Sequence, residues 1–528
     1  MSSLRCDILL RHGLLVDGSG APGTQADLAI LDDKIVAMGN LSDWAAGVEY
    51  DAASLVICPA FIDVHTHCDL SILHNPCQVS MVYQGIGSVV VGNCGIGGGQ
   101  VDDSPVFSME QRWLKPHGVE VDWKGLAGHL KRVEETGIAI NYLPLCAHGT
   151  LRKQAMEFAQ RAPDEGEMLA MKREVADCME AGAWGFSTGL EYTPGSFAET
   201  DELVELTKIA AEGNGYYTSH LKSEGDFLEE CVEEAIEICK RAQVPLQLSH
   251  HKAEGRKNWG KVNRTLARIE EECANGMDIM ADVYPYTAFQ TSMMVALLPA
   301  WARDGTPEES MRRLIDADAR ARIIGEMRQA DLDYEAASIG SCRTHREWQG
   351  KSVAEVARSE RKAPEEFVID FLVEEHGHAS VAYFAISEDD VRTVLKHPLV
   401  MVGSDAVGYD PFGSMGKERP HPRCYGAFPR VLSTYCREER LLTLEQAVYK
   451  MTGMPARRLG LRDRGLLRTG NRADVAIFDA ERIQDRSTFT EPHQLSEGIA
   501  GLIVNGRWVL RDGELTGARP GAVLRKNG

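Results

Sequence analysis

Residues 58–67 read CPAFIDVHTH, a short and nearly continuous apolar run that ends in two histidines one residue apart. Similar runs recur along the chain, separated by charged segments with helical periodicity such as residues 157–181. Continuous hydrophobicity of this kind is typical of parallel strands that are buried on both faces. The eight runs are 58–65, 87–93, 138–148, 182–189, 216–220, 245–250, 277–286 and 397–405. Eight strand-helix units predict an α/β fold of the (β/α)₈ TIM-barrel class.

The two ends of the chain have a different hydrophobic pattern from its middle. Both show alternating apolar positions broken by Gly and Asp clusters, which is the pattern of half-exposed strands, and Asn505-Gly506 predicts a hairpin turn. Neither end has enough strands for a stable sheet alone. We therefore expect residues 1–57 and 465–528 to pair into one small β domain beside a catalytic barrel over 58–464. The seventh and eighth runs are too far apart for one helix, which predicts an inserted subdomain at about 288–345.

Composition excludes several classes of protein. The 528 residues include 57 Lys and Arg against 78 Asp and Glu, a net charge of −21, which argues against nucleic acid as a main partner. The thirteen cysteines form no CxxC pair, a pattern that favours a reducing, cytoplasmic location. No stretch approaches the roughly 20 apolar residues that span a bilayer, so we expect no membrane partner. Nothing in the sequence bears on oligomeric state.

Metal-ligand residue types stand at the ends of five of the eight runs. His65 and His67 end the first, Cys94 follows the second, His220 ends the fifth, His250 the sixth and Asp405 the eighth. Strand alternation puts His65 and His67 on one face, and barrel enzymes carry their chemistry at the carboxyl ends of the strands. Imidazole, thiolate and carboxylate together favour Zn²⁺. The sequence therefore predicts a zinc site in the barrel mouth.

Other interpretations of single residues stay open at this point. Cys94 could be an inert buried thiol in a turn that needs its neighbouring glycines. His148 and His251 favour structural, hydrogen-bonded roles. The glycine-rich segment 92–100 lacks the Gly-Lys-Ser/Thr ending of a phosphate-binding loop.

The sequence resembles the amidohydrolase superfamily and, within it, the N-acyl-D-amino-acid deacylase (D-aminoacylase) family, across essentially the whole chain. The matching segments are PAFIDVHTHCD (59–69), VVVGNCGIG (89–97), FSTGLEYTPGSFAET (186–200), SHLKSEGD (219–226), SHHK (249–252), ADVYPYTA (281–288), GSDA (403–406), HPRCYGAFPRVL (421–432), KMTGMPARRLGLRDRG (450–465) and ADVAIFD (473–479). The resemblance implies a metal-dependent hydrolase barrel whose substrate is a small N-acyl-D-amino acid.

The resemblance also implies roles for individual residues. Cys94, His220 and His250 match the ligands of a tightly held zinc, and His65, His67 and Asp405 match a second, weaker metal site. Asp405 also matches the catalytic aspartate. Lys252 and Tyr284 resemble groups that hold the substrate carboxylate, with Tyr192 and Arg423 as neighbours. Many superfamily members have a carboxylated lysine on the fourth strand; this chain has Ser187-Thr188-Gly189 there, which implies that Cys94 anchors or bridges the metals instead.

These roles imply a mechanism. Zn²⁺ acidifies water and polarises the amide carbonyl, while Asp405 accepts the proton and passes it to the leaving amine. The alternatives are another amidase of the superfamily, such as a hydantoinase or an isoaspartyl dipeptidase, a metal-dependent aminopeptidase, or a metal-free scaffold protein on the same fold.

The segment TAFQTSMMVALLPAW at 287–301 contains no Lys or Arg and is expected to line the side-chain pocket. In that case Met293, Met294, Leu297 and Leu298 supply apolar surface, and apolar D-amino acids are preferred over D-aspartate and D-glutamate, because a buried carboxylate there has no partner.

Overall fold

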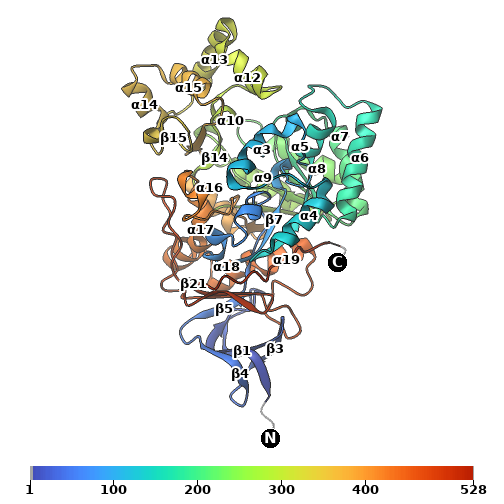
Figure 1. Cartoon of the computed structure of the whole chain (residues 1–528), viewed down its shortest axis with the longest axis vertical. Coiled ribbons are helices and arrows are strands. Elements are labelled where there is room, and N and C mark those ends of the chain that lie inside the picture. Colours follow the sequence, from blue (N-terminus) through green and yellow to red (C-terminus); the bar gives the residue numbers. More distant parts are fainter. Residues whose placement is uncertain (1–3, 527–528) are drawn as a thin grey trace.

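The computed structural model describes residues 4–526, and at its centre lies the predicted barrel (Figure 1). Its strands are β6 (Phe61–Asp63), β7 (Ile86–Val91), β8 (Asn141–Pro144) with β9 (Cys146–Ala147), β10 (Gly185–Gly189), β11 (Tyr216–His220), β12 (Leu246–Leu248), β13 (Ile279–Val283) and β17 (Val400–Val402). All neighbouring pairs are parallel. A parallel bridge between Thr66 and Ala406 joins the end of the first strand to the end of the last, which closes the ring. All eight predicted strands are confirmed.

Helices surround the barrel and bury their apolar faces against its strands. The helices that follow the first four barrel strands are α1 (Ser71–His74), α2 (Val79–Val82), α3 (Ser108–Leu114), α4 (Gly125–Thr136), α5 (His148–Met156), α6 (Glu165–Glu180) and α7 (Thr200–Glu212). The later ones are α8 (Leu228–Ala242), α9 (Lys261–Ala274), α16 (Glu388–Lys396), α17 (Arg423–Arg430), α18 (Leu444–Met451) and α19 (Gly453–Leu459). In α8 the buried side chains recur every three or four residues, for example at Cys231, Ala235 and Cys239, which fixes the face turned to the strands.

A nine-stranded sheet combines both ends of the chain, as the strand patterns predicted. Its strands are β1 (Arg5–Leu15), β2 (Thr24–Leu31), β3 (Lys34–Gly39), β4 (Ala45–Asp51), β5 (Val56–Pro59), β18 (Val475–Phe478), β19 (Ile499–Val504), β20 (Arg507–Arg511) and β21 (Glu514–Leu515). The antiparallel pair of β5 with β18 joins the N-terminal strands to the C-terminal ones. Asn505 and Gly506 both have positive φ between β19 and β20, as a two-residue hairpin turn requires.

The insertion between β13 and β17 lies at the opposite end of the molecule from this sheet (Figure 1). It contains β14 (Phe289–Ser292), α10 (Met293–Leu297), α11 (Ala300–Arg303), α12 (Pro307–Ile315), α13 (Ala317–Gln329), β15 (Ala337–Ile339), α14 (Val353–Ser359), α15 (Pro364–Glu374) and β16 (Ser380–Tyr383). Its three strands pair in the order β14-β16-β15, and its separate hydrophobic core runs from Met293 to Val381. The insertion is therefore longer than the expected 288–345, because β16 must return to pair with β14.

Among the described helices, none is long and apolar enough to cross a membrane.

Candidate metal centre

The carboxyl ends of the barrel strands bring all six sequence-predicted ligands into two overlapping groups. One contains His65, His67, Cys94 and Asp405, and the other contains Cys94, His220 and His250. Within each group the atoms able to bind a metal lie within 4.8 Å of one another. All of these side chains are buried except His67, which is partly exposed. Cys94 belongs to both groups, as expected for an anchoring or bridging thiol.

Individual distances show how tightly these atoms are grouped. The Sγ of Cys94 lies 3.2 Å from His65 Nε2 and 3.5 Å from His250 Nε2. The Nδ1 of His220 lies 2.9 Å from His250 Nε2, and the Nε2 of His67 lies 3.0 Å from Asp405 Oδ1. One group combines two imidazoles with a thiolate, and the other adds two more imidazoles and a carboxylate. These donors suit Zn²⁺.

Three of the six residues have a backbone conformation that side chains other than glycine rarely adopt. The φ angles are 53° at Cys94, 32° at His250 and 53° at Asp405, all in the left-handed region. Each residue lies two or three positions beyond the end of a barrel strand, where the chain turns out of the sheet. Backbone strain of about 1–3 kcal/mol per residue persists only where the surroundings enforce it, and it concentrates at functional sites.

Three carboxylates lie behind the histidines, and sequence reasoning missed all of them. Asp282 Oδ1 lies 3.0 Å from His65 Nδ1, Glu224 Oε1 lies 3.0 Å from His250 Nδ1, and Glu191 Oε2 lies 3.0 Å from His220 Nε2. In each case the carboxylate faces the ring nitrogen that points away from the other ligands. Carboxylates in this position fix the tautomer and the orientation of metal-binding imidazoles. Asp282 lies in the seventh run, so a search for carboxylates in all eight runs could have found it.

The charges around the centre keep its acids ionised. Burial alone would raise the pKa of the Cys94 thiol, but His65 and His250 lower it well below its ordinary value. Burial would likewise raise the pKa of Asp405, yet Arg423 and His67 hold it well below the usual carboxyl range. A thiolate and a carboxylate are the forms that bind a metal.

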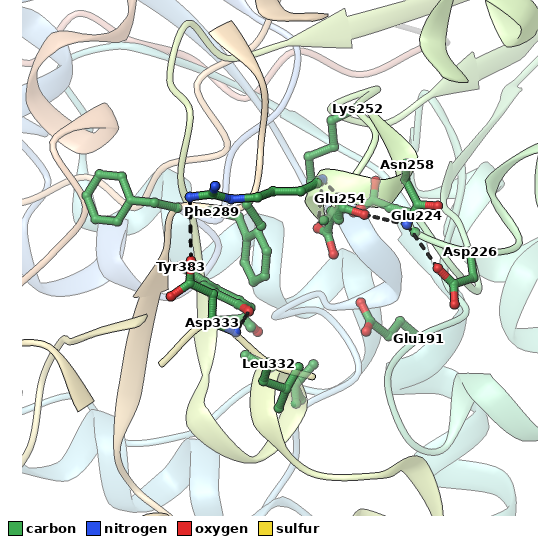
Figure 2. A pocket seen from close by; sticks show the side chains of 18 of the residues that line it. Glu191, Glu224, Asp226, Lys252, Glu254, Asn258, Phe289, Leu332, Asp333 and Tyr383 are labelled. Carbon is green, nitrogen blue, oxygen red and sulfur yellow. Dashed lines mark hydrogen bonds and ion pairs between the residues drawn. The ribbon is translucent and has the colours of Figure 1, made fainter. Parts of the chain in front are cut away.

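A pocket of about 880 Å³ opens beside this centre, and Figure 2 shows part of its wall. Tyr192, Lys252 and Tyr284 all line it, as do His220, His250 and Asp405. The Tyr284 hydroxyl is buried and has no hydrogen-bond partner among the described residues. A buried hydroxyl without a partner is costly unless a ligand supplies one.

Lys252 and Arg423 differ in how they face the pocket. The Lys252 ammonium lies 2.5 Å from Glu224 Oε2 and 5.7 Å from the centre of the Tyr284 ring. Arg423 is not among the residues that line the pocket. Its Nη1 lies 2.7 Å from Asp405 Oδ2, and its guanidinium covers the Tyr284 ring. The structure thus pairs Arg423 with Asp405 rather than exposing it to the cavity.

The residues of segment 287–301 that line the pocket are not the ones that were expected. Met293, Leu297 and Leu298 lie in the core of the insertion, and Met294 packs against that core. The expectation that these four line the pocket is wrong, because α10 packs against β16, β14 and α11, which places these side chains in or against the core of the insertion. Phe289, Val295 and Ala296 of the same segment line the pocket instead.

The histidines interpreted as structural lie outside both groups. His148 Nε2 lies 2.9 Å from Glu202 Oε1, and His251 Nε2 lies 2.8 Å from the Thr265 hydroxyl. Both are buried and already have a protein partner.

Known proteins match the chain along nearly its whole length. A family model described as the amidohydrolase family matches residues 48–510. The chain is 36% identical to the N-acyl-D-glutamate deacylase of Alcaligenes xylosoxydans xylosoxydans, over 99% of this chain and 97% of that protein. It is 34% identical to the D-aminoacylase of the same organism, over 98% of each.

A solved structure matches the fold as closely. The N-acyl-D-glutamate deacylase from Bordetella bronchiseptica, complexed with zinc and a phosphonate inhibitor that mimics the tetrahedral intermediate, superimposes with a TM-score of 0.84. Its sequence identity to this chain is 34%, and the match covers 99% of this chain and 100% of that one.

Proposed function

The chain belongs to the amidohydrolase family, and on that premise we propose that it hydrolyses N-acyl-D-amino acids. The reaction is zinc-dependent and releases a carboxylate and a free D-amino acid. The observation that carries the proposal is the pair of ligand groups sharing Cys94 beside a substrate-sized pocket, which His220, His250 and Asp405 line. This geometry supports a metal-dependent hydrolase over a metal-free scaffold, because every expected ligand position is filled.

The residues of both groups fit zinc. Cys94, His220 and His250 would hold one tightly bound ion, and His65, His67 and Asp405 a second, weaker one beside Cys94. Bound zinc supplies a Lewis acid that polarises an amide carbonyl and makes water more acidic. Glu191, Glu224 and Asp282 hold the imidazoles in place, so that the ligand geometry exists before substrate arrives.

The chain's own groups move the proton and hold the substrate. Asp405, ionised beside Arg423, accepts a proton from the attacking water and returns it to the departing amine nitrogen. Lys252 and the partnerless Tyr284 hydroxyl bind the substrate's α-carboxylate, with Tyr192 beside them on the pocket wall. Fixing the carboxylate orients the scissile amide toward Asp405.

The pocket supports a preference for apolar over acidic side chains. Phe289, Val295, Ala296, Leu332 and Phe384 supply apolar wall, some of it visible in Figure 2. Each basic residue on the described pocket wall already faces an acid. The pairs are Lys252 with Glu224, Arg256 with Asp333 and Lys257 with Asp226. With Lys252 assigned to the substrate's α-carboxylate, an acidic side chain finds no further unpaired cation on the described wall, and the carboxylates Glu191 and Asp331 repel it.

A substrate panel tests this function. We expect kcat/KM for N-acetyl-D-leucine and N-acetyl-D-methionine to exceed that for N-acetyl-D-glutamate and N-acetyl-D-aspartate by at least about tenfold. Hydrolysis of an acidic substrate as fast as the leucine derivative would overturn the side-chain preference. Hydrolysis of hydantoins or dipeptides in preference to all four would overturn the deacylase function.

The cysteines support a cytoplasmic location for this activity. All thirteen are free thiols in the structure, and most are buried, as in proteins kept in a reducing compartment.

A further inference from the structure

A second pocket, of about 220 Å³, opens on the His67 side of the metal centre. Its wall is largely apolar and comes from four separate segments of the chain. The apolar side chains are Leu70, Ile96, Val101, Trp113, Val407 and Met415. None of the functions assigned above uses this pocket.

The two pockets occupy opposite halves of the barrel mouth. The pocket of Figure 2 is lined by segments that follow β10, β11, β12 and β13, together with the insertion and with Asp405, which follows β17. The second pocket is lined by segments that follow β6, β7, β9 and β17. Because the strands are arranged in a ring, these two sets face each other across the mouth. The metal centre lies between them: His220 and His250 line the first pocket, and His67 lines the second.

An N-acyl amino acid extends in two directions from its scissile amide. The amino-acid arm carries the α-carboxylate, which the proposed function places at Lys252 and Tyr284 in the first pocket. With the amide carbonyl at the metal centre, the acyl arm must leave on the other side. We propose that the second pocket binds the acyl chain of the substrate, an inference that rests on the proposed function.

The size and charge of the pocket define which acyl groups fit. An apolar cavity of about 150 Å³ accommodates benzene, so 220 Å³ holds a hexanoyl or phenylacetyl group rather than acetyl alone. The polar part of the wall includes three carboxylates, Asp69, Glu110 and Glu418. No Lys or Arg occurs among the described residues that line it. The pocket therefore selects uncharged acyl groups of medium length and rejects acyl groups that end in a carboxylate.

Hydrolysis of N-acetyl-, N-hexanoyl- and N-succinyl-D-leucine by the zinc-loaded enzyme tests the inference. We expect kcat/KM for the hexanoyl substrate to exceed that for the acetyl substrate at least about tenfold, because four more methylenes are buried. The succinyl substrate should be the poorest of the three. Equal values for acetyl and hexanoyl would overturn the acyl pocket and leave the deacylase function standing. No hydrolysis of any N-acyl-D-amino acid would overturn both.

Narrowing the pocket provides a second test. Ile96 is 50% exposed at the pocket, so Ile96→Trp adds bulk there without overpacking the core. This variant should lower the ratio of kcat/KM for the hexanoyl substrate to that for the acetyl substrate at least about tenfold relative to wild type. Ile315→Trp is the matched control, since Ile315 is 66% exposed on α12 and lines neither pocket. An equal loss on both substrates in Ile96→Trp would contradict the assignment.

Discussion

At the scale of single residues, Cys94 is the side chain on which both ligand groups depend. Its thiol lies within 3.5 Å of imidazole nitrogens from two different strands, and nearby histidines lower its pKa. Its left-handed φ shows that the β7 turn is held in an unfavourable conformation. The turn thus holds this thiol between histidines of both candidate ligand groups at a cost in backbone strain.

Cys94→Ser should remove tightly bound zinc and, with it, hydrolysis. Serine has nearly the same shape, but its hydroxyl is neutral at pH 7 and is a much weaker ligand than a thiolate. Metal analysis of the purified variant, alongside wild type, measures the loss. Asp405→Asn is the matched comparison: it should keep the zinc at Cys94, His220 and His250 but lose about 10²–10⁴-fold in kcat. Stoichiometric zinc and normal turnover in Cys94→Ser would show that the thiol is a bystander.

The six candidate ligands could be located from sequence because each lies at or just after a strand end, and strand ends are visible as local patterns. The supporting groups could not be found in this way. Glu191 and Glu224 lie in loops. Their role depends on the imidazole that each contacts, and only the folded structure shows that contact. The contact of Arg423 with Asp405 is also invisible to local pattern, because the two residues are eighteen positions apart across a loop whose path the sequence does not specify.

At the scale of secondary-structure elements, the positions of strands could be predicted from local hydrophobic pattern. The pairing of strands far apart in the chain could not. Runs such as 216–220 became β11 with the same bounds, because continuous burial follows directly from apolar composition. The end of the insertion was misjudged because β16 pairs with β14, almost ninety residues earlier in the chain. A pairing across that separation leaves no periodic signal in either segment.

One buried ion pair joins the terminal sheet to the barrel. Asp474, directly before β18, lies against Arg464, accepts a hydrogen bond from Asn141 of β8 at 3.1 Å, and accepts another from the backbone of Asn505 at 2.6 Å. Both charged side chains are almost completely buried. These contacts fix the position of the terminal sheet relative to the barrel.

Asp474→Ala should destabilise the protein by about 3–5 kcal/mol, because it leaves the Arg464 guanidinium buried without its partner. Urea unfolding followed by tryptophan fluorescence measures the change. Glu497→Ala is the control, since Glu497 pairs with Arg486 on the exposed surface just before β19 and should change stability by no more than about 0.5 kcal/mol. Similar midpoints for both variants would mean that the buried pair does not hold the sheet to the barrel.

At the scale of the whole molecule, acid stability reports on the buried histidines that serve no metal site. His129 on α4 is fully buried, and burial lowers its pKa from an ordinary 6.5 to about 4. Between these two values the unfolded chain binds more protons than the folded one, so stability is fully present above pH 6.5 and falls as the pH is lowered toward 4. Between pH 8 and pH 5 this residue accounts for a loss of about 2 kcal/mol.

Replacing His129 by leucine, which is of similar size and does not titrate, should reduce that acid-dependent loss. Urea midpoints at pH 8 and pH 5 for wild type and His129→Leu measure the difference. The variant should show a smaller drop between the two pH values, whatever its stability at pH 8. An identical drop in both proteins would place the acid sensitivity in other groups.

The central claim for the whole molecule is that zinc at Cys94, His220 and His250 drives hydrolysis of N-acyl-D-amino acids. Its most direct test is hydrolysis of N-acetyl-D-leucine and N-acetyl-L-leucine by enzyme stripped of metal with a chelator and then given back one equivalent of zinc. We predict that stripped enzyme is inactive and that zinc restores hydrolysis of the D-substrate, with kcat/KM at least about 100-fold above that of the L-substrate. Full activity without metal, or equal hydrolysis of both enantiomers, would contradict the account.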